Sequence, residues 1–307
     1  MTNGVNHMAR DLRLQKYEAV IDNIVDWRQE EHKALLSMNE DKGGRPFSYS
    51  DELILRISAL RFVFCDKLIP TEALARRIYG GSPDHTTISR RLYRLDVKWT
   101  VRRRHKKGRL LAIDASGMSV CRTGSYRHSK YGGMPRFYKL HAIIDVDTKE
   151  LVDLRVTRDR CHDNRKFIPL VRESAYKGDT VYADGAYDSK DNFDHLEKNG
   201  IKPGIKIRKN FSTDCRGSSA RWKAVIDQFG IRTRRLKGRG IVLDEDRISY
   251  NQKKWKEKVG YGRRWLVEAF FSVFKRVYGN YASSHSWRKV KNEMTLKLLL
   301  YNMLLKI

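Results

Sequence analysis

Five short apolar runs constrain the fold of this chain more than any other feature. They lie at residues 110–113, 140–144, 151–156, 180–183 and 205–207. Helical periodicity separates some of them, near residues 164–174 and 188–198. Short apolar runs bounded by turn residues are typical of buried strands. Three strands, a helix, a strand, a helix and a strand, followed mostly by helix, predict an α/β domain with a mixed sheet.

The first hundred residues have helical periodicity instead. Two helices, separated by the break Gly80-Gly81, are expected at 70–78 and 85–95, the second started by Ser82-Pro83-Asp84. This pattern predicts a helix-turn-helix whose exposed face offers donors to phosphates and base edges. A basic, solvated helix in an ordinary bundle fits the same spacing. The candidate DNA contacts are Thr86, Thr87, Ser89, Arg90, Arg91 and Arg94.

The charge balance indicates a polyanionic partner. The 307 residues include 63 Lys and Arg against 36 Asp and Glu, a net charge of +27. Such an excess attracts phosphate backbones. We find no apolar run long enough to cross a membrane and no signal peptide, which predicts a cytoplasmic protein. The four cysteines form no C-x-x-C pair, which argues against zinc and disulfides.

Two aspartates occupy the same kind of position. Asp114 follows the apolar sequence RLLAI and precedes small residues, and Asp184 follows TVYA and precedes Gly185. The carboxyl ends of buried strands are where α/β folds place ligand and metal sites. For one such aspartate alone, a turn residue or a helix cap is the favoured interpretation. Their shared setting favours a site.

The segment 261–278, YGRRWLVEAFFSVFKRVY, predicts one long helix. At about 100° per residue, five polar side chains fall within roughly 80° of one another. They are Tyr261, Arg264, Glu268, Ser272 and Lys275. An exposed face held by salt bridges is the alternative, but such a face normally carries several acids. This one carries a single carboxylate among cations.

Three carboxylates from two strands and a helix are suited to a pair of Mg²⁺ or Mn²⁺ ions. Zinc would instead prefer His and Cys ligands. We therefore expect Asp114, Asp184 and Glu268 to be both metal ligands and catalytic residues.

These residues resemble a known family. The spacing of Tyr261, Arg264, Glu268 and Lys275 matches the Tyr-Arg-Glu-Lys signature of DDE transposases from insertion sequence families four and five. The sequences IDASG and YADGAYDS resemble the segments that hold the two family aspartates. PDHTTISRRL resembles the N-terminal DNA-binding segment. The resemblance runs from about residue 45 to the end of the chain.

The resemblance implies an RNase H-like catalytic domain at 110–307, a basic linker at 101–109 and an all-helical, helix-turn-helix-like DNA-binding domain at 1–100. It implies cleavage of transposon ends by activated water and joining of the 3′ hydroxyl to target DNA. Tyr261, Arg264 and Lys275 would contact the DNA end. The expected partners are double-stranded inverted-repeat ends, target DNA and a second copy of the chain, in a prokaryotic cytoplasm at the nucleoid.

Two alternatives stay open. One is a domesticated DNA-binding protein that no longer uses its acids, and the other is an RNase H-like nuclease without strand transfer. The chain departs from the family in its short N-terminal domain. It also has a basic stretch at 210–260 in place of the large β insertion of some relatives, so hairpin formation is left open.

Secondary candidates lie outside the signature. Lys139 and His141, on one side of the second strand, are candidates for facing DNA, with an ordinary strand role as the alternative. Asp163 is expected to cap the helix that follows it. Trp265, near the boundary between the two faces of its helix, is expected to lie partly in the core.

Overall fold

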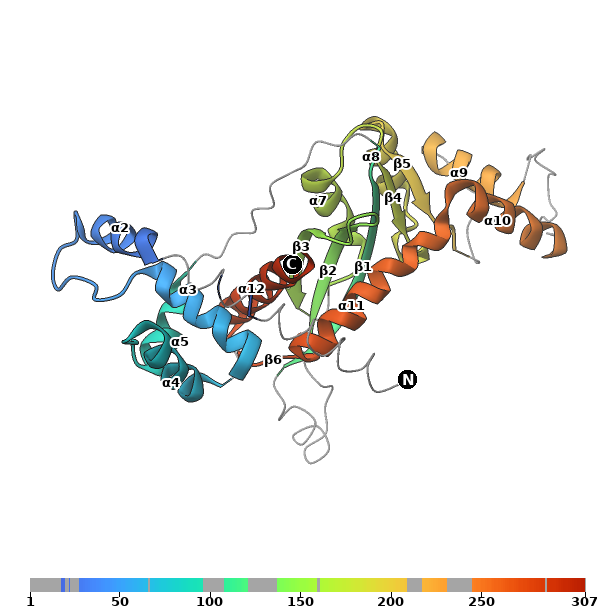
Figure 1. Ribbon diagram of the computed structural model, residues 1–307. Coiled ribbons are helices and arrows are strands. Elements are labelled where there is room, and N and C mark those ends of the chain that lie inside the picture. Colours follow the sequence, from blue (N-terminus) through green and yellow to red (C-terminus); the bar gives the residue numbers. More distant parts are fainter. Residues whose placement is uncertain are drawn as a thin grey trace, which may run out of the picture. The chain divides into compact units, whose positions relative to one another are not determined.

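The computed structural model describes residues 18–19, 22, 28–65, 67–95, 108–120, 137–158, 161–208, 217–230, 245–284 and 286–306. The chain divides into two compact units, whose elements are labelled in Figure 1. The first unit comprises Met1–Trp99, Ser119–Arg136 and Phe274–Ile307, and the second comprises Thr100–Met118 and Phe137–Val273. We describe each unit by itself.

A mixed sheet forms the centre of the second unit. Its strands are β1 (Leu110–Val120), β2 (Phe137–Asp145), β3 (Leu151–Arg158), β4 (Thr180–Ala183) and β5 (Lys202–Ile205). They are arranged in the order β3-β2-β1-β4-β5. β2 and β3 pair antiparallel, whereas β4 pairs parallel with both β1 and β5. This mixed order is that of an RNase H-like sheet, so the predicted fold class is confirmed.

Three helices pack against one face of this sheet. They are α7 (Asn164–Ser174), α8 (Lys190–Lys198) and α9 (Ser219–Phe229). Alternate strand residues such as Leu111, Ile113 and Val181 join Phe167 and Leu196 from the helices in one buried cluster. Side chains alternate between the faces of a strand, so the residues between them point to the opposite face.

The opposite face of the sheet contacts the end of α10 (Glu245–Val259) and the turn that follows it. The Tyr182 hydroxyl donates to the carbonyl of Val259 at 2.8 Å. Gly260, at φ +71°, ends α10 and begins a 3₁₀ turn at Tyr261–Arg264, which leads into α11 (Trp265–Tyr278). The prediction of one continuous α-helix from residue 261 is therefore wrong. The 3₁₀ turn forms because Arg263 bonds back three residues to the Gly260 carbonyl.

Two predicted strand boundaries are also wrong. β1 continues to Val120, so Asp114 lies inside a strand and not at its end. The extension of β1 pairs with β6 (Tyr281–Ala282), a partner more than a hundred residues away that no local pattern reveals. β5 begins at Lys202 and includes Pro203, which the edge position of this strand tolerates.

In the described part of the first unit, the regular elements are helices, apart from β6 and the paired end of β1. They are α2 (Arg28–Asn39), α3 (Asp51–Leu60) with a π-helical turn at Arg61–Cys65, α4 (Leu68–Tyr79), α5 (His85–Arg94) and α12 (Trp287–Lys306). The carboxylate of Asp84 caps α5, and Gly80 ends α4 in the left-handed conformation at φ +72°. Leu53, Ile57 and Ile88 bury the contact between α3 and α5.

The C-terminal helix belongs to the N-terminal unit. The Asn292 side-chain amide donates to the carbonyls of Leu92 and Leu95, each at 2.7 Å. Sequence alone left α12 as either core or a dimer contact, and it packs against α5 and α3. Among the described helices, none is long and apolar enough to span a membrane.

Candidate active site

The register of two parallel strands brings the candidate aspartates together. β1 and β4 pair from Leu110↔Thr180 to Ala112↔Tyr182. Continuing this register by two residues sets Asp114 on β1 beside Asp184, the residue that follows β4, and the charge of Asp184 contributes to raising the pKa of Asp114. Both share the side of Tyr182, the face opposite the apolar cluster. The pairing register thus places the two acids side by side.

Asp184 also caps the turn that follows β4. One carboxylate oxygen accepts the Ala186 N–H at 2.9 Å and begins the 3₁₀ turn Gly185–Tyr187. The sequence left open whether Asp184 belongs to a site or caps a turn, and the structure shows that it follows β4 directly and caps the turn. The cap fixes the direction of its carboxylate.

Arg264 links the third acid to the first. Its guanidinium lies 3.5 Å from Asp114 Oδ2 and forms a hydrogen-bonded ion pair with Glu268 Oε1. The Arg264 side chain is 19% exposed, whereas that of Glu268 is 54% exposed. Arg264 therefore bridges Asp114 and Glu268, with the helix carboxylate on the solvent side.

Burial disfavours the ionised form of Asp114. Desolvation, followed by the charges of Asp184 and Glu268, raises its pKa to about 6, against the opposing effects of the Ala115 N–H and Arg264. A divalent cation beside these oxygens would reverse that balance by favouring the ionised form. The electrostatics and the all-oxygen donor set fit Mg²⁺ or Mn²⁺.

The ligand set is not assembled in this arrangement. Within the described part of the chain, no three His, Cys, Asp or Glu side chains lie together as a ready site for one ion. The Glu268 carboxylate is paired with Arg264. For Glu268 to ligate an ion beside Asp114 and Asp184, it must exchange this partner.

Three residues of the segment 261–278 differ in their surroundings from the helical-wheel expectation. Tyr261 is buried, and its hydroxyl donates to the carbonyl of Ala183 at 3.2 Å. Burial raises the pKa of Tyr261 to about 12. Its placement on the exposed polar face is wrong because residues 261–264 form a 3₁₀ turn. Trp265 is 59% exposed and not part of the core, and Lys275 is half-buried on the part of α11 that belongs to the first unit.

The pair Lys139 and His141 is engaged with protein groups. Lys139 Nζ lies 3.0 Å from Asp163 Oδ1, and His141 Nε2 lies 2.8 Å from the Thr157 hydroxyl. Burial lowers the pKa of His141 to about 4. Asp163 stands at the N-cap position of α7 but its side chain makes no cap bond, so that expectation is wrong. The carboxylate binds Lys139 instead.

The candidate DNA contacts on α5 fall into two groups. The Thr86 and Thr87 hydroxyls both bond the capping carboxylate of Asp84. Arg91 forms an ion pair with Asp51 and is largely buried. These groups have roles in holding α5 in place.

Other residues of α5 face outward. Arg90, Arg94 and Tyr93 are exposed, and Ser89 accepts a hydrogen bond from Lys289 at 2.8 Å. Tyr93 was missed by the sequence reasoning. Its position three residues after Arg90, on the same helical face, was the available signal.

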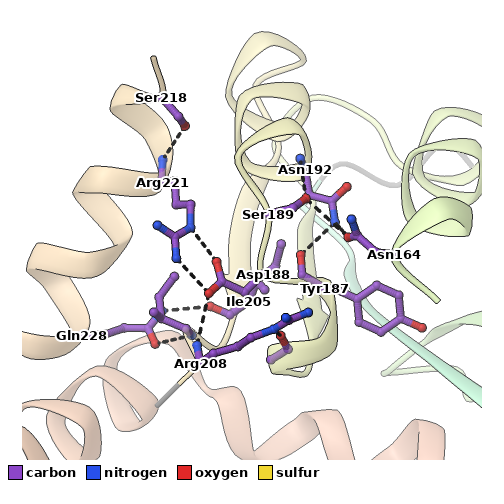
Figure 2. A network of polar contacts seen from close by, with 12 residues as sticks. Asn164, Tyr187, Asp188, Ser189, Asn192, Ile205, Arg208, Ser218, Arg221 and Gln228 are labelled. Carbon is purple, nitrogen blue, oxygen red and sulfur yellow. Dashed lines mark hydrogen bonds and ion pairs between the residues drawn. The ribbon is translucent and has the colours of Figure 1, made fainter. Parts of the chain in front are cut away.

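Sequence reasoning also missed the residues that surround the turn after Asp184. Asp188, with a side chain only 2% exposed, accepts two hydrogen bonds from Arg221 at 2.7 and 3.0 Å (Figure 2). The backbone N–H of Arg208 donates to the same carboxylate at 3.2 Å. A second aspartate in DGAYDS was the available signal, because a buried acid requires a partner. The sequence does not say which cation serves.

Comparison with known families assigns the chain. The pattern of the family described as transposase DDE domain matches residues 105–303, about two thirds of the chain. The chain belongs to this family, and it is a DNA transposase, an enzyme of metal-dependent DNA cleavage and transposition. The two aspartates and the glutamate described above are the residue types after which the family is named.

Solved structures of transposases give weak overall likenesses. A piggyBac transposase synaptic complex with hairpin DNA matches with a TM-score of 0.47 and 12% identity, over 93% of this chain and 71% of that one. A Mos1 transposase paired-end complex with the left transposon end gives 0.23 and 10%, over 72% and 80%. A Mos1 mariner paired-end complex with Mn gives 0.23 and 12%, over 84% and 87%. The assignment rests on the family match.

Proposed function

We propose that this protein is the transposase of an insertion sequence of families four and five, with Asp114, Asp184 and Glu268 as its catalytic acids. It cleaves the element ends and joins each 3′ hydroxyl to target DNA. The observation that supports this most is the β1–β4 register, which sets Asp114 beside Asp184. Arg264 of the Tyr-Arg-Glu-Lys signature pairs with Glu268 and lies near Asp114, which gives further support.

The three carboxylates would hold two Mg²⁺ or Mn²⁺ ions, which supply an activated nucleophile and stabilise the leaving oxygen of the phosphodiester. Asp114 and Asp184 are fixed by the sheet and the capped turn. Glu268 is more exposed and joins them by leaving Arg264. Arg264 then presents its guanidinium, a planar group that suits a phosphate, to the scissile strand.

DNA contacts are proposed in two places. Arg264 and Lys275 of the signature would contact the transposon end. Tyr261, bonded to the Ala183 carbonyl, and Lys139, paired with Asp163, would contact it only after releasing these partners. The exposed residues of α5 would contact the DNA duplex. The other residues of the set would keep this helix in position. The α5 set comprises Thr86, Thr87, Ser89, Arg90, Arg91 and Arg94.

We also propose the linear division into a DNA-binding part at 1–100, a linker at 101–109 and a catalytic part at 110–307. Most of the linker lies outside the described residues, and Arg109 is buried in an ion pair with Asp179 at 2.8 Å. The active form would be a homodimer or larger on paired inverted-repeat ends, at the nucleoid of a prokaryote.

Substitution of the acids tests the proposal. Asp114→Asn, Asp184→Asn and Glu268→Gln should each lower Mg²⁺-dependent end cleavage by about a thousandfold or more, roughly 4 kcal/mol of activation free energy. DNA binding should survive, since no variant adds a charge that repels phosphate. The substrate is taken from the inverted repeats that flank the gene, and Arg172→Ala on the exposed side of α7 is the control.

Near-normal cleavage by any of the three acid variants would remove that acid from the catalytic set. An assay for joined products separates a transposase from a nuclease that only cuts. A wild-type protein that binds the ends but neither cuts nor joins them would favour the domesticated DNA-binding protein.

A further inference from the structure

One peptide group connects a basic side chain to the carboxylate of Asp184. The Arg208 guanidinium donates through Nε to the Gly185 carbonyl at 2.6 Å. The N–H of Ala186, on the other side of the same peptide bond, donates to Asp184 Oδ1 at 2.9 Å. A peptide group is planar, so fixing its carbonyl also fixes the direction of its N–H. Arg208 thereby sets the donor that holds Asp184.

The second arm of the guanidinium strengthens this hold. Arg208 Nη2 donates to the Ala186 carbonyl at 2.9 Å, so two successive peptide groups after Asp184 are bound by one planar side chain. A Cβ added at Gly185 would lie 3.4 Å from Arg208 Cγ and 3.6 Å from the Lys206 carbonyl. These are ordinary contact distances, so the arginine stem packs directly against the Gly185 backbone.

Buried groups fix the position of Arg208 itself. Its N–H bonds Asp188, which the Arg221 fork holds from α9 (Figure 2). The preceding residue, Ile207, donates its N–H to Gln228 Oε1 at 2.9 Å. Gln228 and Asp188 are both buried. The backbone that carries the exposed guanidinium of Arg208 is therefore held by buried side chains.

We propose that Arg208 is a positioning residue for metal binding, acting on Asp184 through the Gly185–Ala186 peptide group. This rests on the proposed role of Asp184 as a metal ligand. Polarisation adds to this effect, because a cation on the Gly185 carbonyl makes the Ala186 N–H a stronger donor to the Asp184 carboxylate. Without Arg208 the Gly185 carbonyl keeps only the longer hydrogen bond from the Asp188 N–H, at 3.2 Å, so the peptide group and the carboxylate that depends on it are held less firmly.

Calorimetric titration of the full-length, metal-free protein with Mn²⁺ tests this without any DNA. Arg208→Ala should weaken Mn²⁺ binding by about tenfold or more, in the range known for groups that orient metal ligands. Arg208→Lys should fall between it and the wild type, since one ammonium replaces two donors in fixed geometry. Arg172→Ala, an exposed arginine on α7, is the matched control and should bind as the wild type does.

Hydrogen exchange supplies a readout that a general structural role would not move. The amide of Ala186 should exchange faster in Arg208→Ala, while the amides of the paired residues of β4 keep their protection. Unchanged exchange at Ala186, or Mn²⁺ affinity within about twofold of the wild type, would overturn the inference. Should Arg208→Ala fail to fold, the same two measurements on Arg208→Lys decide.

Asp184→Asn separates this inference from the proposed function. If it weakens Mn²⁺ binding while Arg208→Ala and Arg208→Lys do not, Asp184 remains a ligand and the positioning role of Arg208 is wrong. If Asp184→Asn leaves Mn²⁺ binding unchanged, the proposed metal site itself is wrong.

Discussion

The surroundings of Asp184 and of Glu268 differ in almost every respect. The turn after Asp184 is held by Asp188 and Arg221, whose side chains are 2% and 9% exposed. Glu268 is 54% exposed and pairs with Arg264, its neighbour one helical turn away. One acid is thus tied to groups from distant parts of the unit, and the other to a local partner at the surface.

This difference indicates that the candidate acids differ in how firmly their positions are held. Buried ion pairs hold their geometry because breaking them leaves an uncompensated charge. Exposed pairs one helical turn apart contribute little and exchange readily with water or ions. If the three acids bind metal as proposed, Asp114 and Asp184 would hold their positions before an ion binds, whereas Glu268 would change partner on binding.

The largest effect is expected from breaking the buried pair. Asp188→Ala should lower the free energy of unfolding by about 3–5 kcal/mol, because Arg221 keeps its charge without a partner. Denaturant unfolding of the metal-free protein measures it. Glu268→Ala, the matched change in the exposed pair, should cost less than about 1 kcal/mol. Equal losses in the two variants would contradict the contrast.

A smaller effect, with the opposite sign, is expected at Asp114. Its pKa is raised to about 6 from the ordinary value of 3.8, so ionisation destabilises the folded state as the pH rises through that interval. Asp114→Asn should therefore stabilise the metal-free protein by up to roughly 3 kcal/mol above pH 6. The gain should vanish below about pH 4, where the Asp114 carboxyl is protonated in both the folded and the unfolded state. Unfolding free energies measured across this range would refute the idea if the difference were independent of pH.

The smallest effect concerns the bridging cation. Arg264→Gln removes a positive charge that pairs with Glu268 and lies 3.5 Å from Asp114. Mn²⁺ should then bind about fivefold more tightly, roughly 1 kcal/mol, since the metal no longer competes with the guanidinium. Calorimetry checks this, with exposed Arg263→Gln as the control. Weaker binding in Arg264→Gln would show that Glu268 does not need to be released.

Local patterns predicted the elements that depend on local signals. α7 spans Asn164–Ser174 and β4 spans Thr180–Ala183, as the sequence indicated. The start of α5 at His85 follows from the Asp84 cap. In each case the apolar periodicity and the boundary residue are neighbours in sequence, so short-range physics decides the outcome.

Elements whose partners are distant were predicted poorly. The extension of β1 depends on pairing with Tyr281–Ala282, and α12 joins the first unit through Asn292 and its bonds to α5. The helical wheel misplaced Tyr261, which lies in a 3₁₀ turn and bonds the Ala183 carbonyl at the end of β4. Such contacts appear in no window of the sequence.

The sequence by itself determined the types of the candidate residues and their order. It indicated two acids in similar strand settings, a third acid among cations, and a charge of +27 suited to DNA. The tertiary structure alone decided that Asp114 and Asp184 are neighbours, since strand register depends on pairing and not on spacing along the chain. It also decided that Arg208 bonds the turn after Asp184. The Arg208 backbone is held there by buried Asp188, which Arg221 of α9 fixes in turn.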